Sequence, residues 1–185
     1  MYELKDDVFY EELKRYPDLV VDYCLLKNEG PYRGEETHRT ALAYAFRKLK
    51  RAEGGDLTYE LGKAKSRPMD PAALLALPEK PWRKEYVIKG SFHAVGLDIT
   101  SDGGEVPYWN AFLEPPCGCR YGPEDFLSFN AVLFPNGPEK LIAYSWSTDW
   151  SNYFDDGHEW WGASCWSVYD PDLDRIAVIS ASATD

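Results

Sequence analysis

The sequence predicts an α+β fold in which N-terminal helices pack on one face of a mainly antiparallel C-terminal sheet. Apolar residues recur at helical spacing in the first 55 residues, whereas later they alternate with polar ones or form short runs between turn sequences. Helices followed by neighbouring strands are typical of this class. At 185 residues and 44% hydrophobic content, the chain is expected to form a single domain, with a helical part (1–55), a connector (56–84) and a sheet part (85–185).

Two helical regions are predicted in the N-terminal part. Across residues 8–26, apolar side chains spaced by three or four share one face, and Pro17 divides the segment into two short helices. The second region runs over about residues 36–53, with acidic residues at its start, basic residues near its end and a Gly54-Gly55 pair beyond it. These ends agree with the helix dipole and with glycine C-capping. In the connector, residues 70–77 form a further short helical segment.

Five segments are predicted as strands. The first lies at residues 86–94, where apolar and polar side chains alternate as on a half-buried strand. Turn-forming compositions at residues 135–138 and 170–174 predict two hairpins in an antiparallel meander. The other four predicted strands cover residues 127–134, 141–146, 163–169 and 175–181.

The formal net charge of −11 is concentrated in the second part of the chain. Residues 1–67 hold 13 basic and 13 acidic side chains, which leaves 7 basic and 18 acidic ones for residues 68–185. From residue 121 onward, the basic side chains are Lys140 and Arg175 alone, whereas 11 side chains are acidic. A negative field of this kind repels phosphate backbones and attracts cationic surfaces. We therefore expect a basic protein as partner and no nucleic acid, whereas the oligomeric state is left open.

The compartment and the cysteine chemistry are predicted together. The N-terminus has no basic region followed by an apolar stretch, and no apolar run approaches 18 residues, so a cytoplasmic protein without a membrane span is expected. Four cysteines are few for a disulfide scaffold. Cys117 and Cys119 form a C-x-C pair, for which only the distant His158 and Cys165 offer further zinc ligands. Reduced, unreactive thiols and no metal or other cofactor are the prediction.

The segment 146–162 is the predicted partner-binding site. It joins two predicted strands through a connection long enough to suggest a function. Trp and Tyr provide large, rigid contact surfaces, and acidic residues around them attract basic partners. The competing interpretation is that the rings complete the core. The predicted binding residues are Trp146, Asp149, Trp150, Tyr153, Asp155, Asp156, Glu159, Trp160 and Trp161.

Catalytic chemistry finds little support in the sequence. The oxygen ligands of segment 146–162 do not have the spacing of a calcium loop, and the common nucleotide-binding, hydrolase and zinc-protease motifs are not found. His158 is near Cys165 and Ser167 along the chain, which alone does not make a nucleophile and base. His38 and His93 are expected to play no special part. No catalytic residue is predicted, and a non-enzyme is favoured.

Two main functional hypotheses follow, and a metal-dependent or thiol enzyme stays open as a third. The first is a non-catalytic acidic interaction protein, such as an immunity-type inhibitor that binds a basic bacterial protein toxin through its acidic, aromatic C-terminal surface. The alternative is a carbohydrate-binding or carbohydrate-cleaving domain, in which indole rings stack on sugars and carboxylates bind hydroxyl groups or act as acid and base. This alternative uses Trp150, Trp160 and Trp161 with Asp149 and Asp155.

Overall fold

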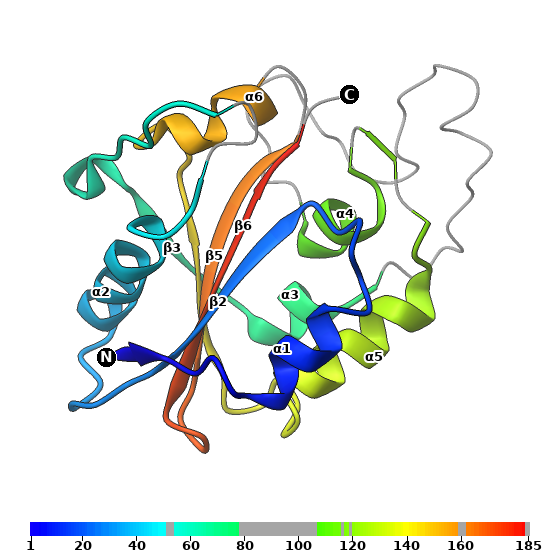
Figure 1. Ribbon diagram of the computed structural model, residues 1–185. Helices are drawn as coiled ribbons and strands as arrows, with labels where there is room; N and C mark the ends of the chain where they lie inside the picture. Colours follow the sequence, from blue (N-terminus) through cyan, green and yellow to red (C-terminus); the bar gives the residue numbers. More distant parts are fainter. Residues whose placement is uncertain (51–53, 78–106, 116, 119, 159–161, 184–185) are drawn as a thin grey trace.

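The computed structural model describes residues 1–50, 54–77, 107–115, 117–118, 120–158 and 162–183. Within these residues the chain forms helices and a six-stranded antiparallel sheet, which confirms the α+β class (Figure 1). The strand order is β1-β2-β6-β5-β4-β3. The strands are β1 (Tyr2–Glu3), β2 (Val21–Lys27), β3 (Ser66–Met69), β4 (Ile142–Trp146), β5 (Ala163–Asp170) and β6 (Arg175–Ser182).

Helices cover both faces of this sheet. Helix α2 lies on one face, and α1, α4 and α5 lie on the other, so the two N-terminal helices are on opposite sides (Figure 1). The helices are α1 (Val8–Leu13), α2 (Glu35–Phe46), α3 (Pro71–Leu75), α4 (Tyr108–Leu113), α5 (Pro123–Leu133) and α6 (Asp155–His158), with short 3₁₀ turns η1 (Leu61–Lys63) and η3 (Asn152–Phe154).

The two layers of helices create two hydrophobic cores. Successive side chains of a strand point to opposite faces, so Trp166 and Val168 of β5 enter the core under α1, α4 and α5, which we call the α5-side core. Cys165 of β5 and Val178 of β6 enter the opposite one, the α2-side core. Strands β5 and β6 are buried on both faces, which explains their nearly continuous apolar sequences.

The α5-side core consists mainly of aromatic rings. Phe9 of α1 meets Phe129 of α5 edge to face, with ring centroids 5.4 Å apart. A chain of hydroxyl groups crosses this apolar region: the Tyr23 and Tyr108 oxygens are 2.7 Å apart, and Tyr108 donates to Oδ1 of Asn130 at 3.1 Å. The buried side chains of Tyr108 and Asn130 therefore have partners within this core, as burial requires.

Most of the predicted elements are confirmed. The helix expected at 36–53 is α2, although it ends earlier, at Phe46. The strands expected at 141–146, 163–169 and 175–181 are β4, β5 and β6, and residues 170–174 form the turn of the β5–β6 hairpin. The short helical segment at 70–77 contains α3, whose N-cap Asp70 accepts a hydrogen bond from the Ala72 amide. The strand expected at 86–94 lies outside the described residues.

The strand predicted at 127–134 is wrong, because these residues belong to helix α5. Pro123 occupies the first helical turn, where its missing N–H costs nothing, and the Asp125 carboxylate accepts from the Gly122 amide at 2.7 Å. The turn at 135–138 therefore joins a helix to β4 and not two strands. The buried side chains recur at helical spacing, at Phe126, Phe129, Asn130 and Leu133.

The second short helix predicted within residues 8–26 is also wrong. After α1 and Pro17 the chain enters β2, which pairs with β6 over its whole length, from Val21 opposite Ala181 to Lys27 opposite Arg175. The short sequence fits either structure, and pairing with two neighbouring strands decides in favour of the sheet. Residues predicted as helical thus supply one of the inner strands.

Candidate functional site

The loop that follows β4 is fastened to a segment more than 80 residues earlier in the chain. Tyr59 and Ser151 form an isolated antiparallel bridge. The Glu60 amide donates to the Trp150 carbonyl at 2.7 Å, and the Ser147 amide donates to the Lys65 carbonyl at 2.8 Å. These bonds extend the pairing of β3 and β4 beyond the sheet, so residues 147–152 have a defined backbone.

Side chains add to this attachment. The Thr58 amide donates to Oδ1 of Asn152 at 2.8 Å, while Nδ2 of Asn152 donates to the Asp56 carbonyl at 3.0 Å.

At the far end of the loop, a Cβ atom on Gly162 would overlap the carbonyl oxygen of Ala183. Only glycine allows this close approach, which brings the chain back into β5.

The aromatic residues of the loop point inward. Trp146, Trp150 and Tyr153 are 5%, 2% and 5% exposed and belong to the α2-side core. Trp150 packs on Phe46 of α2, with ring centroids 4.4 Å apart. The prediction that these three rings form a contact surface is wrong, and the competing interpretation, that they complete the core, holds for them. Their large apolar area is better removed from water than exposed.

The carboxylates of the same loop face outward. Asp149 and Asp155 are exposed, and Asp156 is partly exposed. Glu159, Trp160 and Trp161 lie outside the described residues. The described part of the predicted site is therefore divided by the fold: Trp146, Trp150 and Tyr153 pack beneath the loop, and Asp149 and Asp155 are exposed at the surface.

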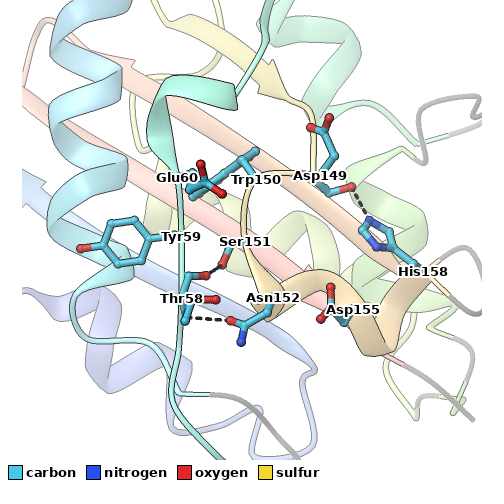
Figure 2. A pocket seen from close by; sticks show the side chains of 10 residues that line it. Thr58, Tyr59, Glu60, Asp149, Trp150, Ser151, Asn152, Asp155 and His158 are labelled. Atoms are coloured by element: carbon cyan, nitrogen blue, oxygen red, sulfur yellow. Dashed lines mark hydrogen bonds between the residues drawn. The ribbon is translucent and has the colours of Figure 1, made fainter.

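The exposed carboxylates border a hollow of about 240 Å³ between segment 58–60 and the loop 148–158 (Figure 2). Three of the lining residues are acidic, and they come from two separate parts of the chain: Glu60 from the first, Asp149 and Asp155 from the second. No lysine or arginine lines the hollow in the described structure. The complete lining consists of Thr58, Tyr59, Glu60, Thr148, Asp149, Trp150, Ser151, Asn152, Asp155 and His158.

The three carboxylates differ in their partners. The hydroxyl of Ser147 donates to Asp149 at 2.6 Å, and this bond is the main reason why the pKa of Asp149 lies below its ordinary value. Glu60 pairs with Lys63 at 2.7 Å on the exposed surface. The backbone amide of Asp155 donates to the Asn152 carbonyl, whereas its exposed carboxylate makes no hydrogen bond or ion pair within the described ranges. The charge of the hollow is thus negative at neutral pH, with Asp155 fully available.

Glu60, Thr58 and Tyr59 were not predicted as site residues. They lie in the segment interpreted as a connector, about 90 residues before the loop that they face. No local pattern marks them, because the two segments meet only through tertiary contacts such as the Tyr59–Ser151 bridge and the bonds of Glu60 and Thr58 to the loop.

A nucleophilic centre at His158 is contradicted by the structure. Nε2 of His158 lies 2.8 Å from the hydroxyl of Thr148, on the rim of the hollow (Figure 2). Cys165 and Ser167 are both buried, and burial raises the pKa of the Cys165 thiol to about 12, so the thiol stays protonated. Ser167 bonds instead to His38.

Further site types were sought across the described part of the chain. Among those residues, no group of three or more His, Cys, Asp or Glu side chains is placed to hold a metal ion. Cys117 is an exposed free thiol, and Cys119 lies outside the described residues. None of the described helices has the length and apolar character needed to cross a membrane.

The hollow is therefore an acidic recess with a fixed backbone, buried aromatic supports and exposed carboxylates. Carboxylates from two segments, with no lysine or arginine in the described lining, favour the binding of a cationic group there. No protein-family profile, no curated protein and no solved structure matches this chain.

Proposed function

We propose that this chain is a non-catalytic binding protein whose acidic hollow receives a basic side chain of a protein partner, as an immunity-type inhibitor of a basic bacterial toxin does. The observation that carries the proposal is the meeting of Glu60, Asp149 and Asp155 at one hollow without a cation in its lining. The net charge of −11 adds a long-range attraction for basic proteins.

Preorganisation supports this role. A loop that is ordered before binding loses little conformational entropy on association, so more of the electrostatic attraction remains as affinity. Here Trp150 and Tyr153 fix the loop from the core, and Asn152 fixes it to the neighbouring segment. The rings thus contribute by positioning the carboxylates and not by touching the partner.

The carbohydrate alternative is not favoured by any observation in the described residues. A sugar-binding platform needs an accessible indole face, and Trp150 is 2% exposed and packed on Phe46. Trp160 and Trp161 lie outside the described ranges and give it no support.

A cytoplasmic location is part of the proposal. Cys24, Cys117 and Cys165 are free thiols, which suits a reducing compartment. Burial keeps two of them unreactive, since it raises the pKa of both Cys24 and Cys165 to about 12.

The binding test uses a panel of purified basic bacterial toxin domains, screened against the immobilised chain. For a domain that binds, removal of the three hollow charges should weaken binding about tenfold, since three exposed pairs of about 0.5 kcal/mol each approach 1.4 kcal/mol. The variant combines Glu60→Gln, Asp149→Asn and Asp155→Asn. The dissociation constant is measured at low and at physiological salt, and the variant should also lose salt dependence.

A matched control removes the same net charge elsewhere. Glu11, Glu36 and Glu124 are exposed and lie on α1, α2 and α5, outside the hollow. The triple Glu→Gln variant at these positions should bind within about twofold of the original chain, since distant exposed charges are screened. Equal loss of affinity in both triple variants, or binding of no basic domain above a neutral domain of similar size, would contradict the proposal.

A further inference from the structure

A chain of polar side chains crosses the interface between α2 and the sheet. His38 of α2 is fully buried, with its Nδ1 2.8 Å from the Ser167 oxygen on β5 and its Nε2 3.0 Å from the Tyr32 hydroxyl. The indole N–H of Trp146 on β4 donates to the same Ser167 oxygen at 2.8 Å. His38 is the residue that α2 contributes to this network of hydrogen-bonded side chains, and it connects the helix to β4 and β5.

One set of bond directions satisfies every member of this polar network. An indole nitrogen only donates, so the Ser167 oxygen accepts from Trp146. With Nδ1 of a neutral His38 unprotonated, the Ser167 hydroxyl donates to Nδ1 and Nε2–H donates to the Tyr32 oxygen, so no member lacks a partner. A second proton on Nδ1 would remove the acceptor of the Ser167 hydroxyl and place a charge in an apolar layer.

The surroundings do not compensate such a charge. Burial lowers the pKa of His38 from 6.5 to about 4, and the carboxylate of Glu35 opposes only part of this shift. Glu35 is already paired with Arg39 at 2.8 Å. Among the described residues, the titratable and charged groups near the imidazole are three tyrosines and one ion pair. Tyr144 of β4 has its ring 4.7 Å from the imidazole, Tyr169 of β5 stacks on Tyr32 at 4.2 Å, and Glu35 pairs with Arg39 on α2.

We propose that His38 is an acid-sensitive latch that holds α2 on the sheet, and that its protonation releases this helix before the rest of the protein unfolds. Release gives the imidazolium access to water and leaves the α5-side core intact, because that core lies on the other face and receives no residue from α2. Partial opening of one packed element is a common lower-energy alternative to global unfolding. The latch does not depend on the proposed binding function.

Amide hydrogen exchange tests the latch on the full chain, compared at pH 7 and pH 5 after correction for intrinsic rates. In the open state His38 binds a proton below about pH 6.5, whereas in the closed state it does so only near pH 4. Opening is therefore favoured at the lower pH, and the protection of the α2 amides should fall about 20-fold from pH 7 to pH 5. At pH 5 the α2 amides should also be less protected than those of β6. Equal protection of the α2 and β6 amides at pH 5 would show that α2 separates from the sheet only when the whole protein unfolds, and would overturn the proposal.

Two substitutions identify the group responsible. His38→Asn keeps an acceptor near the Nδ1 position but does not titrate, so its α2 protection should not change with pH. His158→Asn removes an exposed histidine and should retain the full change. An unchanged 20-fold loss in His38→Asn would contradict the latch. Should that variant fail to fold, the NMR titration of the original chain decides: a His38 midpoint near 4 is expected, and one near 6.5 overturns the proposal.

Discussion

Replacing Arg175 with methionine is expected to lower the free energy of unfolding by about 3 kcal/mol or more, because it leaves a carboxylate unpaired in a largely buried site. Arg175 is 6% exposed and donates from Nη1 to Asp7 at 3.0 Å and from Nη2 to the Leu133 carbonyl at 2.5 Å. Asp7 is also the N-cap of α1, where it accepts from the Phe9 amide. One guanidinium thus joins the start of α1 and the end of α5 to β6.

Urea denaturation of matched variants measures this effect. Lys140→Met removes an exposed pair with Asp172 and should change stability by less than about 0.5 kcal/mol. The double variant Asp7→Asn with Arg175→Met should recover part of the loss, because asparagine still caps the helix and no charge remains unpaired. A loss below about 1 kcal/mol for Arg175→Met would show that the pair does not join these elements.

Replacing Trp150 with alanine is expected to lower the free energy of unfolding by about 3 kcal/mol or more, because it removes a buried indole and leaves a cavity against α2. Besides Phe46, the indole contacts the Phe154 ring at 5.6 Å between centroids, and its N–H donates to the Ser147 carbonyl. The substitution removes the support under the acidic hollow, so partner binding should weaken as well.

Leu127→Ala is the control for this substitution, since Leu127 is 53% exposed on α5 and its truncation should cost less than about 0.5 kcal/mol. Chemical denaturation of both variants makes the comparison. A Trp150→Ala protein as stable as the original would mean that the indole is at the surface, and would restore the hypothesis that it contacts the partner directly.

The sequence predicted those parts of the fold that local patterns determine. The β5–β6 hairpin follows from two apolar runs around a turn-forming segment, and α2 follows from helical spacing with charged ends. Segment 127–134 was assigned to the wrong class because a short, largely apolar segment of this kind suits a strand as well as a helix. Its start at Gly122-Pro123, with Asp125 as capping partner, would have identified the helix.

The candidate site was predicted only in part, for a physical reason. Exposure of Asp149 and Asp155 follows from their charge, because an unpaired carboxylate is costly to bury. Burial of Trp150 depends on α2, which no local pattern places above it. The roles proposed for Glu60 and His38 could not be predicted, since the residues that they face lie about 90 and 129 residues away in the sequence.

Carbodiimide cross-linking of the complex with a basic toxin domain shows whether the acidic hollow is the binding surface. This reagent joins a carboxylate to a lysine amine in direct contact, and mass spectrometry identifies the two residues. Cross-links from Glu60, Asp149 or Asp155 to the partner are expected. Cross-links confined to carboxylates on other surfaces, such as Glu124 or Asp172, would contradict this role of the hollow.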